Sequence, residues 1–559
     1  MSIPTKSSSL VTLIVIFFFW GFVAASNDIL IPVFKKALDL SQLQSQMISF
    51  AFYVAYTVGS ILYFVISGLL KRDILNLIGY RNGLALGLII SAVGTLLFIP
   101  ASNNASFPLL IGGLFTVGLG FSLQQIAANP LAIQMGDPSK GNMRLSLAGG
   151  INNVGTTIGP VIVSFAIFGG ISNPEAGLNL EAVQIPYLVL GAAFLVAAVF
   201  FKFSSVPDRI GGETQGGKLR LNKKRILNAI QNFGFYIVFF GIGSIILNFI
   251  GLEFKILIWL GDGFASRIII ASIGLLLVIL AIIFKKIIEN DIQEVEEVPQ
   301  FPHIGIRETL RYPQVVLGMI AIFVYVGVEV STASNLPEFM KQKLGTPESA
   351  VAPYVSLFWA SLMIGRWTSA AGAFDLKEAT KLKLSLLLPF AAFGVFAFAN
   401  VIGGHSIQSL YPYLLIVVIL AVADAVSEGK PARQIIIYSS LGILALIIGI
   451  FSSGMTSVFA FISVGLFCST LWPCIFTLGI AGLGEKTNTA SSLLIMMIMG
   501  GGVISLIQGA LSDEKMLGIQ HSYWVGVVCF AYLTFFAVYV GRILKKRGIS
   551  FDATEGGGH

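Results

Sequence analysis

The chain has 559 residues, and only 11% of them are charged, against roughly 25% in an average soluble domain. Hydrophobic residues make up 55% of the chain, with 44 Phe and 60 Gly. This composition excludes an ordinary soluble enzyme, a disordered protein and a nucleic-acid-binding protein, because too little charge is present to cover a surface in water. The net charge of +7 is weak evidence for an acidic partner, since Lys and Arg of membrane proteins concentrate in cytoplasmic loops.

Apolar runs follow one another along the whole chain. The first continues through Asn27–Pro32, so we expect a retained membrane helix rather than a cleaved signal peptide. A spanning helix needs about 20 mostly apolar residues, and we predict about sixteen such helices. They lie at 10–34, 47–70, 82–102, 107–135, 144–170, 183–204, 226–250, 264–287, 313–336, 351–373, 383–401, 410–427, 433–453, 456–483, 488–511 and 522–543.

The positive charges predict the orientation of these helices. With both termini in the cytoplasm, 28 of the 35 Lys and Arg residues fall in cytoplasmic segments, and 7 fall on the other side. The positive-inside rule predicts a bias of this kind. We therefore expect a multi-pass protein, surrounded by the lipid bilayer, with both termini in the cytoplasm.

A weak internal repeat relates the two parts of the chain. Segment 31–36 shares Pro, Phe and Lys with segment 336–341 at an offset of 305, and Pro130 matches Pro473 at an offset of 343. The change in offset indicates an insertion in the second part, where the short runs of 383–427 lie. Without this hairpin and the hairpin at 226–287, two halves of six helices remain, which is the parallel-repeat plan of major facilitator transporters.

We therefore predict an all-α, polytopic membrane protein with a major facilitator fold and two extra transmembrane hairpins. The N-terminal half covers 1–204, and the C-terminal half covers 313–559 with the inserted hairpin 383–427. Between them, 205–312 contains cytoplasmic linkers and the hairpin 226–287.

Acidic side chains within the predicted helices are candidates for ion coupling. A charge at the centre of a bilayer costs about 2.5–3.5 kcal/mol on insertion scales, so such residues face a cavity or a partner. Asp28, beside Asn27, can take up a proton or a cation, or can be a structural residue near the outer interface. Glu329 can do the same, or bond to a neighbouring helix. We expect Asp424 to be solvated at a helix end, and Arg366 to snorkel or to pair in a gating network.

Amide side chains cluster on the fourth and fifth predicted helices. Gln124, Gln125 and Asn129 lie on the fourth, and Asn152 and Asn153 lie on the fifth. An amide both donates and accepts hydrogen bonds, as recognition of sugar hydroxyls requires. The alternative for each is a hydrogen bond that joins two helices.

We find in the sequence none of the common motifs for catalysis or metal binding. The chain has no nucleophile elbow, no phosphate-binding loop and no His/Cys cluster, and Cys468, Cys474 and Cys529 all lie in apolar runs. We therefore predict that the protein is not an enzyme, has no catalytic residues and holds no metal or bound cofactor.

Four motifs resemble a known family. They are Phe-Phe-Phe-Trp-Gly-Phe at 17–22, Asn-Asp-Ile-Leu-Ile-Pro at 27–32, Gln-Ile-Ala-Ala-Asn-Pro at 125–130 and Trp-Pro-Cys-Ile-Phe-Thr-Leu-Gly-Ile at 472–480. Together they resemble the fucose:proton symporter family of the major facilitator superfamily, and its glucose/galactose permease branch more closely. The resemblance covers the twelve core helices.

The resemblance implies sugar uptake by alternating access across a bacterial inner membrane, with Asp28 as the proton-linked acid. The chain departs from the family at Gln125, where the fucose permease has Glu, and at Gly149, where the family usually has Gln. Coupling to H+ or Na+ through Asp28 or Glu329, and simple facilitation, therefore all stay open.

We expect a hexose such as glucose, galactose or fucose to bind between the halves, contacted by Asn27 and the amides of the fourth and fifth helices. We expect the protein to be a monomer. The alternatives are an exporter of a drug or non-sugar metabolite, which would have an apolar cavity, and a transport-inactive sugar sensor, which would bind sugar without flux.

Overall fold

A computed structural model describes residues 9–23, 38, 42–70, 73–136, 140–168, 184–204, 206–208, 306–346, 348–373 and 377–549. The predicted hairpin 226–287 lies outside the described residues, as do both ends of the chain. Every regular element in the described ranges is helical. Within these ranges, ten helical stretches are long and apolar enough to cross a membrane, and several of them join consecutive elements.

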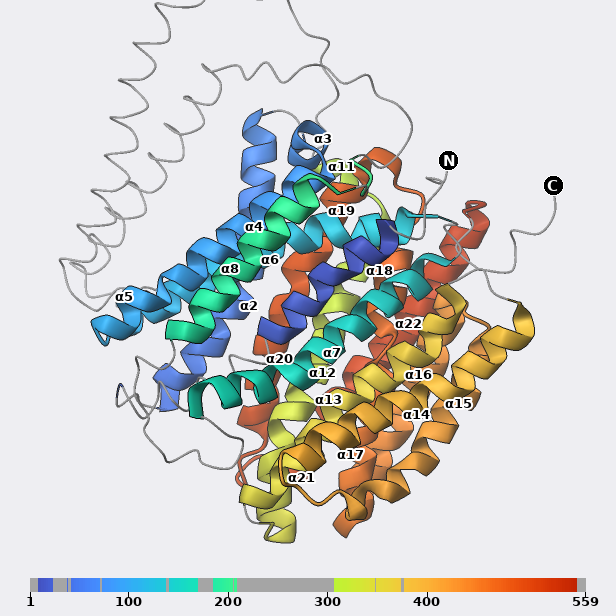
Figure 1. Cartoon of the computed structure of the whole chain (residues 1–559). Helices are drawn as coiled ribbons and strands as arrows, with labels where there is room; N and C mark the ends of the chain where they lie inside the picture. The colour runs from blue at the N-terminus through green and yellow to red at the C-terminus, as the bar shows by residue number, and fades with distance from the viewer. Residues whose placement is uncertain are drawn as a thin grey trace, which may run out of the picture. The chain divides into compact units, whose positions relative to one another are not determined.

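The described part of the first half consists of helices (Figure 1). They are the helix Ser9–Val23, α2 (Gln42–Leu70), α3 (Ile74–Ile78), α4 (Tyr80–Leu96), α5 (Phe98–Asn103), α6 (Phe107–Gln134), α7 (Gly141–Phe168) and α8 (Gln184–Lys202). Helix α4 packs against both α6 and α8. Residues 62–78, which comprise the last part of α2 and the whole of α3, belong to a separate compact unit. Within this unit, Tyr63 Oη donates to Asp73 Oδ2 at 2.7 Å.

The second half repeats this plan with additional helices. They are α11 (Ile306–Thr309), α12 (Pro313–Leu344), α13 (Glu348–Ala370), η4 (Ala371–Ala373), α14 (Glu378–Ile402), η5 (Gln408–Tyr413), α15 (Leu414–Ser427), α16 (Pro431–Phe451), α17 (Gly454–Cys468), α18 (Leu471–Ile480), η6 (Gly484–Lys486), α19 (Thr487–Met496), η7 (Met497–Met499), α20 (Gly500–Leu511), α21 (Gly518–His521) and α22 (Trp524–Lys546). Helix α16 packs against α17 and α22, as α4 packs against α6 and α8.

The hairpin of α14 and α15 contacts α13 and α16. Asp424 near the end of α15 accepts hydrogen bonds from Gln434 Nε2 at 2.9 Å and from Tyr438 Oη at 3.2 Å. The expectation of a merely solvated Asp424 is therefore wrong, because two polar side chains of α16 bind its carboxylate. These bonds fix the end of the hairpin to the helix that follows it.

Several helices that were predicted to be continuous are interrupted, such as the run 82–102, which divides into α4 and α5. The run 456–483 divides into α17 and α18, with Ser469 and Thr470 between them, and the run 488–511 divides into α19, the single turn η7 and α20. Such breaks are tolerated at membrane depth where the freed backbone groups are buried in protein. The Ser469 carbonyl is satisfied in this way, since it accepts a hydrogen bond from Arg366 Nε at 2.8 Å.

Glycines allow α4 and α6 to lie side by side in close contact. Gly87 and Gly94 of α4 and Gly113 and Gly120 of α6 recur every seven residues on the facing surfaces. A Cβ atom added at Gly94 would lie 2.6 Å from the backbone nitrogen of Val117. Small residues are typical of the interfaces between helices within membranes, where they let the backbones approach closely and pack.

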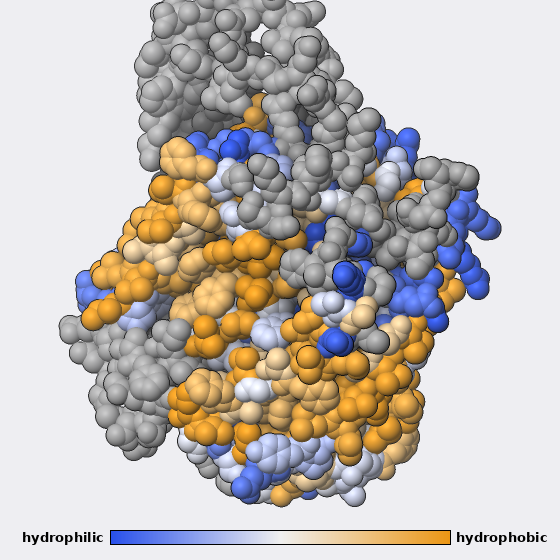
Figure 2. Space-filling view, turned by 45° about the vertical axis from the view of Figure 1, so that its right-hand side comes forward, coloured by the Kyte–Doolittle hydropathy of each residue, from blue (hydrophilic) through white to orange (hydrophobic). Residues whose placement is uncertain are grey.

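The surface of the helices carries large apolar side chains. Four of them expose more than two thirds of their area: Val196 (70%), Phe451 (70%), Leu415 (73%) and Val528 (69%). On the face shown in Figure 2, hydrophobic residues cover the middle and hydrophilic residues gather at the ends. An apolar patch of this extent is expected where the solvent is lipid rather than water.

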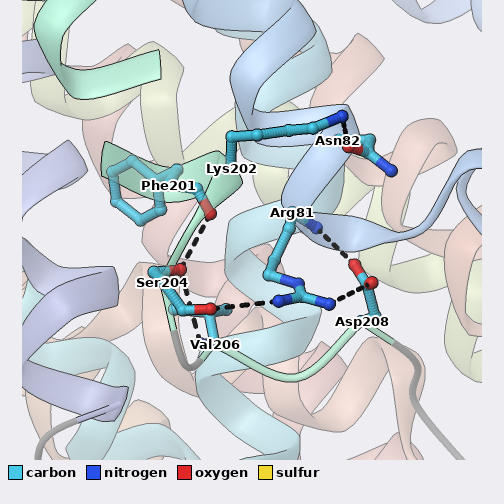
Figure 3. Close-up of polar contacts among 7 residues, drawn as sticks. All are labelled: Arg81, Asn82, Phe201, Lys202, Ser204, Val206 and Asp208. Atoms are coloured by element: carbon cyan, nitrogen blue, oxygen red, sulfur yellow. Dashed lines mark hydrogen bonds and ion pairs between the residues drawn. The ribbon is translucent and has the colours of Figure 1, made fainter. Parts of the chain in front are cut away.

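We call one end of the helices the basic end. It is the end at which α12 and α19 begin and α22 ends, and Arg311, Lys486 and Arg547 lie there around one cavity. Just after the first half, Asp208 binds the start of α4: it accepts from the backbone nitrogen of Arg81 at 3.2 Å and from its Nη2 at 2.6 Å. Arg81 Nη1 donates to the Ser204 carbonyl at 3.1 Å (Figure 3). A carboxylate is favourable at a helix N-terminus, where backbone N–H groups are unpaired.

We expect Gly120→Val to destabilise the protein by roughly 1–3 kcal/mol, because the new side chain would overlap Ser91 and the backbone of Gly87 on α4. Thermal unfolding in detergent measures the effect. The control is Gly112→Val on the same helix, where no atom lies within 4 Å of an added Cβ. Equal losses in the two variants would contradict the close packing of α4 and α6.

Candidate functional site

The helix Ser9–Val23 is the described part of the first predicted membrane helix, on which candidate site residues were expected. Asn27 and Asp28 lie outside the described residues, so their roles in substrate binding and ion coupling stay predictions. Trp20 of this helix donates from Nε1 to Gln124 Oε1 of α6 at 2.8 Å. The carbonyl of Phe17 accepts from Asn152 Nδ2 of α7 at 2.9 Å. The helix is therefore held against both amide-bearing helices.

Gln124 uses both ends of its amide within the first half. Its oxygen accepts from Trp20, and its Nε2 donates to Ser91 Oγ at 3.1 Å, while the side chain is fully buried. In this conformation the amide joins α4, α6 and the first helix. A contact of Gln124 with substrate would require these hydrogen bonds to open.

Gln125, one residue further on, is half-buried and points to a different neighbour. Its Nε2 donates to Tyr56 Oη at 3.1 Å. Tyr56 lies edge-on to Phe52, with ring centroids 5.5 Å apart, and Phe52 in turn lies 5.9 Å from Phe121. Gln125 thus lies beside aromatic rings, an arrangement that can present a polar group and a flat apolar surface to one ligand.

Asn129 is the amide whose hydrogen-bonding capacity is unused. It is 1% exposed, and neither its Oδ1 nor its Nδ2 has a hydrogen-bond partner among the described residues. Leaving a buried polar group unpaired costs about 1–3 kcal/mol. Pro130 follows it inside α6 and lacks an N–H, so the backbone there is also incompletely bonded.

Asn152 belongs to the packing of α7 on the first helix. Gly21 faces the backbone carbonyl of Asn152, and Gly155 faces the carbonyl of Phe18, in both cases with no room for a Cβ atom. This close approach brings the Asn152 side chain to the Phe17 carbonyl. Its amide nitrogen is therefore occupied within the first half.

Arg366 of α13 joins the two halves. Its Nη1 donates to Asn153 Oδ1 at 2.8 Å and to the Gly149 carbonyl at 3.3 Å, both on α7. Its Nε donates to the carbonyl of Ser469, at the break between α17 and α18. A guanidinium has five N–H donors and no acceptor, so carbonyl and amide oxygens from several helices suit it.

Glu329 reaches the same cluster through a tyrosine. Tyr325 Oη lies 3.5 Å from Arg366 Nη2 and forms a short hydrogen bond to Glu329 Oε2. Tyr325 and Glu329 are four residues apart on α12, so they lie on one face of the helix. The structure thus connects Glu329, Tyr325, Arg366 and Asn153 in one chain of polar contacts across the two halves. We call these four residues the Arg366 cluster.

Gly149 makes room for this cluster. A Cβ atom at position 149 would lie 3.1 Å from Arg366 Cδ and 3.2 Å from its Nη1. The departure from the family at this position therefore has a structural consequence here: the guanidinium occupies the space that a longer side chain would need.

Further hydrogen bonds join the halves toward the basic end. Trp367 Nε1 donates to the Gly150 carbonyl at 3.3 Å, and Asn142 Nδ2 donates to the carbonyl of Gly429, just after the α14–α15 hairpin, at 3.1 Å. Tyr80 of α4 donates to Asn488 of α19 in a short hydrogen bond. In the described part of the chain, α7 and α13 form the most extensive contact between the halves.

The site residues predicted from the sequence thus fall into two groups in the structure: some join the two halves, and others pack helices within the first half. Asn153 and Glu329 come together through Arg366, whereas Gln124 and Asn152 lie in packing contacts of the first half. Arg366 was expected to snorkel or to pair, and it pairs. Tyr325 was missed, and its spacing of one helical turn from Glu329 was the available signal. Among the described residues, no group of three His, Cys, Asp or Glu side chains could hold a metal ion.

Comparison with known proteins shows what the chain is similar to. Residues 9–231 match the sequence model of the Major Facilitator Superfamily. A protein named glucose/galactose transporter from Brucella abortus biovar 1 (strain 9-941) is 27% identical over 532 residues, covering 95% of this chain and 93% of its own. The L-fucose-proton symporter of Escherichia coli (strain K12) is 22% identical over 524 residues, covering 93% and 90%.

The chain is similar to transporters of the Major Facilitator Superfamily, in its first part by sequence model and over nearly its whole length by relatives. The crystal structure of the superfamily transporter FucP in the outward conformation matches with a TM-score of 0.59 at 20% sequence identity, covering 95% of this chain and 98% of that chain. The predicted major facilitator fold and the family resemblance are therefore confirmed, and so is the prediction of a multi-pass membrane transporter rather than an enzyme.

We expect Asn153→Ala and Arg366→Gln to be non-additive in this transporter, because each removes the same hydrogen bond. Residues in one polar network typically couple by about 0.5–3 kcal/mol, and the thermal unfolding of the single and double variants measures this energy. Gln184→Ala is the control, since its amide bonds to Ser102 and Asn103 instead. Additive losses for Asn153 and Arg366 would contradict the Arg366 cluster.

Proposed function

We propose that this protein carries a hexose or a related sugar across the membrane by alternating access. Transporters of glucose/galactose and of fucose are similar to it over nearly the whole chain. The single observation that carries the mechanism is Arg366, which binds α7 of the first half from α13 of the second. A contact of this kind can hold the halves together at one end and release them when the pathway opens there.

The sugar site that we propose lies between the halves, next to Gln125 and Asn129. Gln125 has an aromatic neighbour in Tyr56, and Asn129 has two amide atoms without partners among the described residues. Sugars present hydroxyl groups at their rims and apolar C–H faces, which suit amides and aromatic rings, respectively. Asn27, Asn152, Asn153 and Gln124 complete the candidate set, with Gln124 and Asn152 exchanging their present partners.

The coupling ion that we propose is H+ or Na+, bound at Asp28 or Glu329, with no other cofactor. Glu329 is tied through Tyr325 to Arg366, so a cation on its carboxylate would weaken its hold on the tyrosine hydroxyl. That change would reach the contact between the halves. An ion shifts such an equilibrium only to the extent that it binds one state more tightly than the other.

We also propose the domain plan and the cellular setting. The halves are 1–204 and 313–559, with the hairpin 383–427 inserted in the second and the linker region 205–312 between them. Support comes from α16, which packs on α17 and α22 as α4 packs on α6 and α8, while α14 and α15 lie outside this pattern. The basic end faces the cytoplasm of a bacterium, both termini are cytoplasmic, and the transporter is a monomer in the lipid bilayer of the inner membrane.

We expect proteoliposomes to accumulate labelled glucose, galactose or fucose when either a proton or a sodium gradient is imposed. Asp28→Asn and Glu329→Gln test the two candidate ion sites separately. The variant that lacks the coupling carboxylate should equilibrate sugar but lose gradient-driven accumulation, because binding no longer depends on the ion. Tyr325→Phe should behave like Glu329→Gln if Glu329 is the coupling site. No flux of any sugar by folded protein would overturn the proposal.

We expect Lys430→Cys to react with a membrane-impermeant thiol reagent only from the cytoplasmic side, and Lys515→Cys only from the outside. The native cysteines Cys468, Cys474 and Cys529 are free and buried, so the background reaction should be low. Labelling of both sites from one side would contradict the proposed arrangement of the second half.

A further inference from the structure

A cavity of about 290 Å³ opens at the basic end, where the chain enters the second half. It is lined by Glu308, Arg311, Tyr312, Lys486 and Arg547. None of these residues belongs to the Arg366 cluster or to the candidate sugar site. The cavity therefore calls for an explanation other than transport of sugar.

Three separate parts of the chain build this cavity. Glu308 and Arg311 come from α11 and the turn after it, Tyr312 precedes the first residue of α12, and Arg547 directly follows α22. Lys486 ends η6 in the connection between α18 and α19. Elements distant in the sequence thus converge to place three cations around one hollow.

The charge in the cavity is unbalanced. Arg311, Lys486 and Arg547 face a single carboxylate, Glu308, and no described carboxylate lies within 4.0 Å of any of the three cations. Lys486 Nζ lies 5.5 Å from the centre of the Tyr312 ring, a cation–π contact that positions the ammonium group. The cations therefore keep their donors available for an anion from outside the described chain.

We infer that this cavity binds a phosphate-bearing anion. Guanidinium groups match the geometry of phosphate oxygens with paired donors, and lysine adds a point charge. The volume is near the lower end of small-molecule pockets, roughly 300–1,000 Å³, and suits a phosphate with a small attached group. The anion can be the headgroup of an acidic phospholipid, because basic pockets at the cytoplasmic side of membrane proteins bind such lipids, or a soluble phosphate ester.

The position of Lys486 gives the bound anion a route to the rest of the molecule. Asn488, two residues further on, accepts the hydrogen bond from Tyr80 of the first half. An anion held by Lys486 would restrain the connection that carries this contact between the halves.

The test measures binding to the purified full-length protein in neutral detergent. Inorganic phosphate is titrated by ³¹P NMR, and retention of phosphatidylglycerol against phosphatidylcholine is measured by native mass spectrometry. Arg311→Gln and Lys486→Gln should each weaken binding about tenfold, which corresponds to about 1.4 kcal/mol. Glu308→Gln should tighten it, because it removes the opposing charge. Arg542→Gln is the matched control, since Arg542 is an exposed cation on α22 that does not line the cavity.

Weaker retention of phosphatidylglycerol in the Arg311 and Lys486 variants, with phosphate binding absent in all proteins, would support the site with a lipid as its occupant. Weaker binding of phosphate would support the site with a soluble ester as its occupant. Unchanged binding of both probes in these variants, or an equal loss in Arg542→Gln, would overturn the inference. So would a Glu308→Gln variant that binds more weakly.

Discussion

The guanidinium of Arg366 is a charge among membrane-spanning helices, and such a charge must be fully bonded to be tolerated. It finds acceptors in Asn153 and Gly149 of the first half and in Ser469 of the second. Removing any one of them would leave donors unpaired, at a cost of about 1–3 kcal/mol or more for a charged group. The halves cannot separate at α7 and α13 unless water or another residue replaces these acceptors, so this contact constrains any movement between them.

The same contact explains why several other residues have their present form. Gly149 leaves space for the guanidinium, and the break after α17 supplies a carbonyl that a continuous helix would keep for itself. Tyr325 connects Arg366 of α13 to Glu329, which lies on α12 together with Tyr325. Burying Glu329 in the membrane without a partner would cost free energy. Here the Tyr325 hydroxyl connects it to Arg366, because the hydroxyl can donate to the carboxylate and accept from the guanidinium.

The fold was predictable because the lengths of the apolar runs, the distribution of positive charges and the internal repeat can all be read directly from the order of residues in the chain. The divisions at Ser469 and between α4 and α5 were not, since the apolar pattern continues through both. Within the site, the types of residue were predictable and their partners were not. The partner of Gln124 is Trp20, 104 residues away, and this pairing depends on the relative depth of two helices. Tyr325 resembles any packing aromatic until its neighbour Glu329 is seen to share its face.

The most direct test of this account is the distance between the halves at the basic end. Spin labels at Phe203→Cys, at the end of α8, and Lys546→Cys, at the end of α22, lie on exposed positions of the two halves. Double electron–electron resonance should show one main distance in the unmodified background and a shift toward longer distances when Arg366→Gln is added. An unchanged distance distribution would contradict the claim that the Arg366 cluster holds the halves together.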